Sequence, residues 1–136
     1  MAKLSLPKIN IVSVLLWLAR LSLFKPLVVY FLSHMEQLLP VERLMENTHW
    51  VAFHHPQPDY PLHILILPQQ PILSLTDAPL ERPDIYTDLF HLIHRLISDF
   101  ELNTYGYRLI TNGGPNQRIP KWHWHLISDH TGNEHA

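Results

Sequence analysis

The most informative stretch of the sequence is Lys121-Trp122-His123-Trp124-His125-Leu126-Ile127. It alternates polar and apolar residues, which is the pattern of a β-strand with one buried face. In an extended chain Lys121, His123 and His125 share one face, and the two tryptophans and Leu126 share the other. The aromatic face is suited to packing against a helix. Two imidazoles and an ammonium group are then aligned on the opposite side of the strand.

Three interpretations of this histidine row are open. It is a polar sheet face in contact with water, a metal site, or a phosphate site with a histidine nucleophile. Alternating histidines on a strand can chelate zinc, and His54 or His55 is available to complete the ligand set. The ammonium of Lys121 disfavours a cation two residues away. The row alone does not decide among the three.

Outward from this stretch, the chain beyond residue 40 has the pattern of an α+β domain. Runs of β-compatible residues predict strands over residues 50–53, 63–67, 107–110 and 122–127. Prolines make the segment 55–61 an irregular loop, and residues 112–116 have the composition of a turn. Apolar residues recur at helical spacing over residues 83–102, which predicts an amphipathic helix.

Composition narrows the class of protein. Only 16% of the 136 residues are charged and the net charge is −2, so we expect no nucleic-acid partner, because such domains carry a clear basic excess. The low charged fraction also points to a partner, a membrane or a second copy of the chain. The absence of cysteine excludes disulfides, thiolate metal sites and cysteine nucleophiles. The 11 histidines are the reactive groups that remain.

The N-terminal segment differs from the rest in charge and hydrophobicity. Residues 1–35 carry four basic residues and no acidic one, and two basic residues and Pro26 interrupt their apolar run. We therefore expect no transmembrane span, and no signal-peptide cleavage pattern follows the run. An amphipathic helix over about residues 9–24 is expected instead. It either lies on an anionic membrane surface or packs on the domain or a second subunit.

Residues 45–128 resemble the histidine-triad nucleotide-binding superfamily, the HIT proteins. One matching block is Ala52-Phe53-His54-His55-Pro56 followed by His63-Ile64-Leu65-Ile66-Leu67-Pro68, which is similar to the family's strand, proline loop and strand. The second block is Asn112-Gly113-Gly114, Gln117 and the row from Lys121. This block resembles the family's glycine-rich loop followed by His-φ-His-φ-His-φ-φ, where φ is apolar.

The resemblance implies a nucleotide α-phosphate held between that loop and the last strand. His123 is then the nucleophile of a nucleotidyl-histidine intermediate, and His125 hydrogen-bonds the phosphate and helps the leaving group depart. His54 matches an upstream active-site histidine and is expected beside these two. His55 is expected on the loop surface, and His63 is expected to make a structural hydrogen bond.

The resemblance also assigns the phosphate-binding groups. These are the side chains of Asn112 and Gln117 and the backbone amides around Gly113 and Gly114. Three departures from the family pattern accompany them. Lys121 stands at the first triad position and is a donor only, suited to pairing with phosphate as a point charge. The loop before His123 is about two residues short, and Arg118 replaces a small hydroxyl residue.

The sequence therefore predicts a HIT-like antiparallel sheet of about five strands with a central helix and an N-terminal helical arm. We assign residues 1–44 to the arm and residues 45–136 to the nucleotide-binding domain. The predicted activity is hydrolysis or nucleotidyl transfer at a nucleotide α-phosphate, with no cofactor and no metal. The alternative is a nucleotide-binding or membrane-tethered module with weak catalysis. The family implies a homodimer, and we expect a cytoplasmic protein with peripheral contact to anionic membrane through residues 1–35.

Overall fold

One antiparallel sheet organises the part of the chain that this computed structural model describes, residues 42–131. Its five strands lie in the order β1-β2-β3-β5-β4. They are β1 Arg43–Glu46, β2 Trp50–His54, β3 Leu62–Pro68, β4 Arg108–Thr111 and β5 Trp124–Ser128. The predicted α+β fold with about five strands is confirmed. The first strand was not predicted. It spans residues 44 and 45, between which we placed the boundary of the N-terminal arm and the nucleotide-binding domain.

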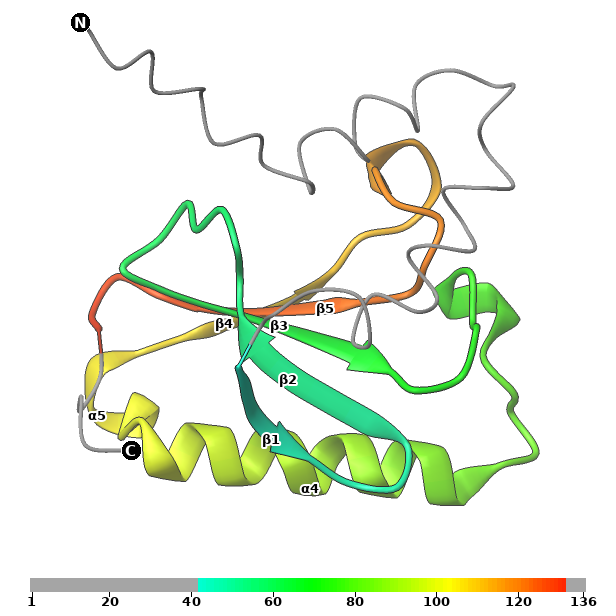
Figure 1. Cartoon of the computed structure of the whole chain (residues 1–136), viewed down its shortest axis with the longest axis horizontal. Helices are drawn as coiled ribbons and strands as arrows, with labels where there is room; N and C mark the ends of the chain where they lie inside the picture. Colours follow the sequence, from blue (N-terminus) through cyan, green and yellow to red (C-terminus); the bar gives the residue numbers. More distant parts are fainter. Residues whose placement is uncertain (1–41, 132–136) are drawn as a thin grey trace, which may run out of the picture.

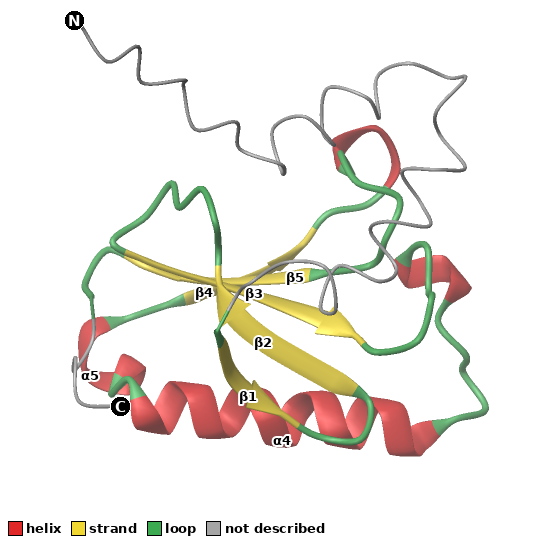
Figure 2. Ribbon diagram, in the orientation of Figure 1, coloured by secondary structure: helices red, strands yellow, loops and turns green. Residues whose placement is uncertain are grey.

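A single long helix covers one face of the sheet (Figure 1, Figure 2). This helix, α4 (Pro83–Asp99), begins with a proline, whose missing N–H is tolerated in the first turn, and Asp84 follows it at the positive end of the helix dipole. Its buried residues recur at helical spacing and are Ile85, Leu89, Leu92, Ile93 and Leu96. The helix stops before the predicted residue 102 because Glu101 adopts a left-handed backbone with φ of 53°. The short helix α5 (Leu102–Tyr105) follows.

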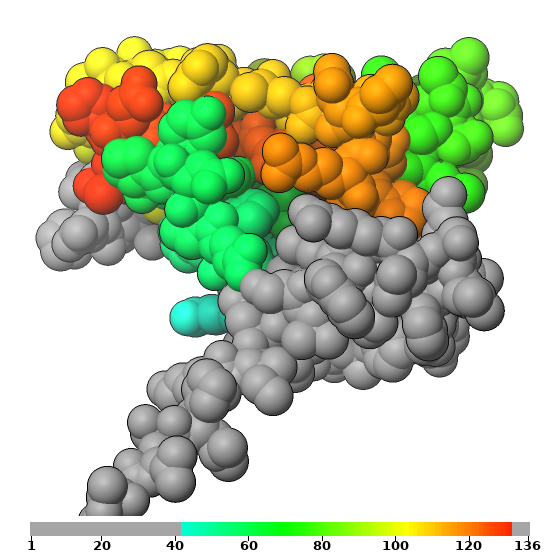
Figure 3. Space-filling view, turned by 90° about the horizontal axis from the view of Figure 1, so that it is seen from above, coloured from blue at the N-terminus to red at the C-terminus, as the bar shows by residue number. Residues whose placement is uncertain are grey.

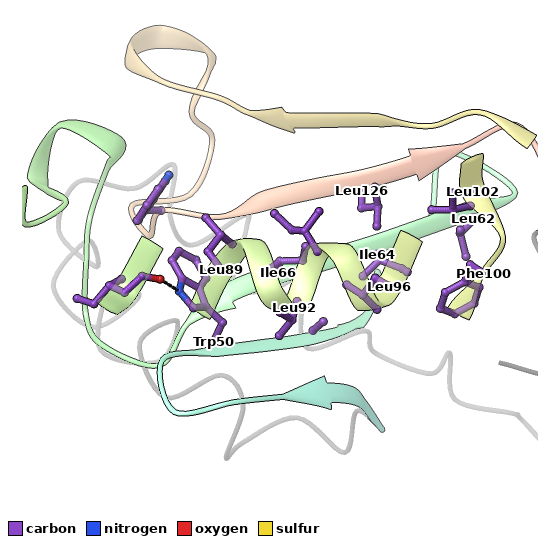
Figure 4. Close-up of a cluster of buried hydrophobic side chains, with 14 of the residues drawn as sticks. Trp50, Leu62, Ile64, Ile66, Leu89, Leu92, Leu96, Phe100, Leu102 and Leu126 are labelled. Atoms are coloured by element: carbon purple, nitrogen blue, oxygen red, sulfur yellow. Dashed lines mark hydrogen bonds between the residues drawn. The ribbon is translucent and has the colours of Figure 1, made fainter. Parts of the chain in front are cut away.

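The core lies between α4 and the sheet, and Trp50 is its anchor (Figure 4). Trp50 is fully buried on β2, and its indole Nε1–H donates a 2.8 Å hydrogen bond to the carbonyl of Ile85 in the first turn of α4. Its ring packs edge-on against Trp122 with centroids 5.1 Å apart. The hydrogen bond fixes the start of the helix over the sheet, and the ring contact packs the segment before β5 against β2.

The opposite face of the sheet carries two loops. The loop between β2 and β3 and the longer connection between β4 and β5 both rise on the side away from α4 (Figure 1). The longer connection contains the short 3₁₀ helix η3 (Gly114–Asn116), and a second one, η2 (Leu75–Asp77), follows β3. The last strand begins at Trp124 and not at residue 122, so residues 121–123 lead into the sheet from the loop.

The predictions for the N-terminal arm, including its helix over residues 9–24, concern residues outside the described part of the chain. Within residues 42–131 no helix is long and apolar enough to cross a membrane.

The two tryptophans Trp50 and Trp124 provide a matched test of the core. Trp50→Phe removes the hydrogen bond to α4 and leaves a cavity, so we expect the free energy of unfolding to fall by about 2–4 kcal/mol. Trp124→Phe should change it by less than about 1 kcal/mol, because Trp124 Nε1 is buried without a hydrogen-bond partner among the described residues. Urea unfolding measures both variants. Equal losses would contradict the anchoring role of Trp50.

Candidate active site

A cavity of about 620 Å³ opens on the sheet face away from α4. Figure 3 looks onto this face, where the β2–β3 loop (green) and the β4–β5 connection (orange) stand on either side of a hollow. The lining residues come from β3, the start of β5 and both loops. They are His55, Gln57, Asp59, His63, Leu65, Leu67, Asn112, Pro115, Asn116, Arg118, Ile119, Lys121, His123 and His125.

The pairing of β3 with β5 places His125 on this face. Leu65 of β3 lies opposite His125, and Ile110 of β4 lies opposite it on the other side. His123 precedes β5 by one residue, and its carbonyl accepts a 2.8 Å hydrogen bond from the Thr111 hydroxyl. The imidazoles of His123 and His125 lie with centroids 4.9 Å apart and nearly perpendicular to each other. The alternation predicted from the sequence therefore brings both rings to one cavity.

One hydrogen bond fixes the tautomer of His123. Its Nδ1 lies 2.6 Å from the main-chain carbonyl oxygen of Lys121. A carbonyl can only accept, so Nδ1 carries the proton and donates it. Burial lowers the pKa of His123, which keeps the ring neutral near pH 7. The lone pair of the neutral ring is therefore on Nε2, and this nitrogen is available as a nucleophile.

A chain of hydrogen bonds fixes the opposite tautomer in His125. The backbone N–H of Asp59 donates to His63 Nδ1 over 3.1 Å, so neutral His63 carries its proton on Nε2. His63 Nε2 lies 2.9 Å from His125 Nδ1 and therefore donates to it. His125 is left with its proton on Nε2. The two histidines of the row thus present different groups, a lone pair from His123 and an N–H donor from His125.

Burial and mutual repulsion keep this cluster uncharged. Burial, followed by the nearby imidazoles of His123, His63 and His55, lowers the pKa of His125 to about 4. Burial also lowers the pKa of His63, with the Asp59 carboxylate acting in the opposite direction. At pH 7 these rings are neutral, because histidine in water titrates near pH 6.5. The assigned tautomers therefore apply at physiological pH.

His54 is not beside these rings, and the prediction that it is there is wrong. Trp50, Ala52 and His54 alternate along β2, and the first two are in the core under α4. His54 consequently points to the helix side, where the centroids of its ring and of the Phe100 ring are 6.1 Å apart. The next residue, His55, faces the cavity and stacks on His63 with centroids 4.3 Å apart. The expectation that His55 lies on the loop surface is therefore also wrong.

The predicted phosphate-binding residues divide into two groups. Asn112 and Lys121 line the cavity, and the Lys121 side chain is buried at its wall with only 3% of the residue exposed. Gln117 instead braces the loop, because its amide donates to the carbonyls of Leu73 and Ile119 at 2.6 and 2.9 Å. Gly113 and Gly114 lie at the start of η3 and are not among the lining residues. Gly114 has a φ of +55°, which suits glycine there.

Comparison with known proteins gives the family. The sequence model of the HIT domain matches residues 37–132. The chain belongs to the HIT family. A HIT-like protein of Helicobacter pylori is 26% identical over 99 residues, covering 71% of this chain and 89% of that protein. A HIT-like protein of Synechococcus elongatus is 34% identical over 91 residues, covering 65% of this chain and 79% of that protein.

Solved structures share the fold. A histidine triad protein from Clostridium difficile superimposes with a TM-score of 0.66 at 25% identity, covering 72% of this chain and 88% of that chain. A HIT family hydrolase from Clostridium thermocellum gives a TM-score of 0.64 at 27% identity, covering 73% and 88%. This protein therefore has the HIT fold, and its histidine row leads into β5, with His125 in the strand and His123 just before it.

The metal interpretation of the row fits this HIT site poorly. His55, His63 and His125 each offer a ring nitrogen within 4.8 Å of the others, as a metal cluster requires. However, backbone N–H groups donate to Nδ1 of His55 and of His63, which places their protons on Nε2. A metal-bound imidazole ordinarily donates from its second nitrogen and gives its lone pair to the ion. His63 gives its Nε2–H to His125, so His55 and His125 are the lining residues of this cluster that keep an Nε2–H donor, which suits an anion.

The tautomers give a direct prediction for NMR. Long-range ¹H–¹⁵N correlation spectra at pH 7 should show His123 protonated on Nδ1, and His63 and His125 protonated on Nε2. On acidification His55 and His125 should titrate near pH 4, and both should return to near pH 6.5 in the urea-unfolded chain. His123 protonated on Nε2 at pH 7 would contradict the assignment.

Proposed function

We propose that this HIT protein is a nucleotide hydrolase or nucleotidyl transferase in which His123 attacks the α-phosphorus of a nucleotide. The observation that carries the proposal is the opposite protonation of the two adjacent imidazoles, with a lone pair on His123 Nε2 and a proton on His125 Nε2. Membership of the HIT family and the likeness to a HIT family hydrolase support it. The substrate class is a nucleotide phosphoanhydride, phosphoramidate or related ester.

The first step forms a covalent intermediate. The lone pair of His123 Nε2 makes the bond to phosphorus, and the bond from phosphorus to the leaving group breaks with its electron pair. The ring becomes a substituted imidazolium, whose Nδ1–H keeps its hydrogen bond to the Lys121 carbonyl. His125 Nε2–H donates to the oxygen on which negative charge develops. An anionic leaving group such as phosphate departs without a proton, and the amine of a phosphoramidate departs with a proton taken from solvent.

The second step releases the nucleotide. A water molecule or another acceptor hydroxyl attacks phosphorus, the nitrogen–phosphorus bond breaks, and its electron pair returns to His123 Nε2. The attacking oxygen loses one proton to solvent. Two easier substitutions thereby replace one difficult one. The acceptor decides whether the overall reaction is hydrolysis or transfer.

Cationic and amide side chains of the wall favour a phosphate in this cavity. Lys121 and Arg118 both line it, and Asn112 adds an amide. Arginine and lysine are the side chains that pair with phosphate oxygens. Asp59 is the carboxylate among the lining residues. We assign phosphate binding to Lys121, Arg118 and Asn112, together with the N–H donor of His125.

The alternative activity is nucleotide binding with weak catalysis, and Lys121 is the residue that favours it. A buried ammonium beside His123 holds a phosphate by charge, and this interaction stabilises the bound substrate as much as the transition state. Under that alternative the protein binds nucleotides but forms no adduct.

The adduct itself separates the two functions. We expect rapid quenching under non-acidic conditions, followed by peptide mass spectrometry, to find a nucleotidyl group on His123 of the wild type. His123→Ala should form no adduct and should lose at least about 10³-fold in kcat across a panel of nucleotide anhydrides and phosphoramidates. His54→Ala, on the other face of the sheet, is the matched control and should keep activity. Full turnover by folded His123→Ala would refute the mechanism.

We further propose that the protein is a cytoplasmic homodimer that makes peripheral contact with anionic membrane through residues 1–35. The excess of basic over acidic residues in that segment supports the membrane contact. The full chain should sediment with phosphatidylserine vesicles, less so as salt is raised, and deletion of residues 1–35 should abolish sedimentation. Failure of the full chain to sediment with such vesicles would exclude this contact.

A further inference from the structure

We propose that His55 is an additional substrate-binding residue, which donates a hydrogen bond from its Nε2–H to a non-bridging phosphate oxygen of the nucleotide. This inference rests on the proposed function, since it names a second donor for the same phosphoryl group. The family resemblance does not assign this role to His55, because the match drawn from the sequence falls on His54.

Position is the first support. His55 is the first residue after β2, and the alternation of side chains turns it to the face opposite Trp50 and Ala52. Its ring stacks on His63 at 4.3 Å and lies nearly parallel to His125, with those centroids 5.9 Å apart. It lines the same cavity as His123. His55 is thus part of the cluster and not of the loop surface.

The tautomer of His55 is the second support. The backbone N–H of Gln57 donates to His55 Nδ1 over 3.0 Å, so neutral His55 carries its proton on Nε2. Burial, followed by repulsion from His63, keeps the ring neutral at pH 7 by lowering its pKa to about 4. His55 therefore enters the reaction as an uncharged donor that cannot act as the nucleophile through Nε2.

The spacing of the donors is the third support. A ring nitrogen of His55 lies within 4.8 Å of one on His125. The two ring centroids are 5.9 Å apart, and hydrogen bonds to oxygen are about 2.7–3.2 Å long, so donors on rings this close together can both reach one phosphoryl group. The site then holds the phosphate with neutral donors from His55 and His125, while Lys121 and Arg118 supply the positive charge.

Titration calorimetry at pH 7.5 with AMP, GMP and inorganic phosphate tests the proposal on the full-length chain. His55→Phe keeps an aromatic ring but removes the donor, and we expect each Kd to rise about tenfold or more, as for loss of a hydrogen bond to a charged group. His55→Gln carries an amide that reaches the position of Nε2, and it should stay within about threefold of the wild type. His54→Phe is the matched control on the other sheet face and should stay within about twofold.

A second variant separates substrate contact from support of the loop. The side chain of His55→Asn can accept the hydrogen bond from Gln57 N–H but is too short to replace Nε2–H. We expect it to keep the melting temperature of the wild type and yet to bind as weakly as His55→Phe. Wild-type affinity in His55→Asn overturns the proposal even if His55→Phe fails to fold.

Other outcomes are equally decisive. An effect on AMP and GMP without one on inorganic phosphate would mean that His55 contacts the ribose, and the phosphate contact would be wrong. Stoichiometric zinc that is lost in His55→Phe would require the opposite tautomer and would overturn the proposal. If wild-type protein binds none of the three probes, the proposed function fails together with this inference. Binding by the wild type that is unchanged in the His55 variants removes this inference alone.

Discussion

The antiparallel pairing of β3 with β5 is the constraint on which the site depends. It brings His63 and His125, 62 positions apart in the sequence, within one hydrogen bond of each other. Because side chains alternate along each strand, the same pairing sends Ile64, Ile66 and Leu126 under α4. The register that places the core residues on one face of the sheet therefore also places the cavity residues on the other face. A slip of one residue in β5 would exchange them, placing the imidazoles under the helix and the leucine in the cavity.

The histidine pair was predictable because polar and apolar residues alternate strongly in the row from Lys121, and the central helix was predictable because its apolar residues recur at helical spacing. In β5 the tryptophans and histidines differ so much in polarity that the two faces are unmistakable. In β2 this signal is missing, since Trp50, Val51, Ala52 and Phe53 are all buried. With both faces apolar, the sequence did not reveal which of His54 and His55 points to the cavity. Trp50 faces the core, so His54 lies on the same side of the sheet and His55 on the cavity side. Only the fold shows this position of Trp50.

The other surprises come from contacts between distant segments. His63 was expected to make a structural hydrogen bond, but its partner follows from the strand register and no local pattern gives it. Gln117 matched a phosphate-binding position, yet its amide reaches the carbonyl of Leu73, which belongs to the segment after β3. The strand β1 is short, lies at the edge and has exposed Arg43 and Glu46 at its ends. It carries too little apolar alternation to be recognised.

The acceptor that orients His123 is a main-chain carbonyl. Any residue at position 121 supplies such a group, so evolution or an engineer can exchange the side chain there without turning the neighbouring ring. Charge in the wall of the cavity and orientation of the reactive nitrogen are consequently separate design variables. A lysine in place of a histidine changes the charge and leaves the orientation of the reactive nitrogen intact. Position 121 is thus a natural place to alter substrate preference while the attacking atom stays where it is.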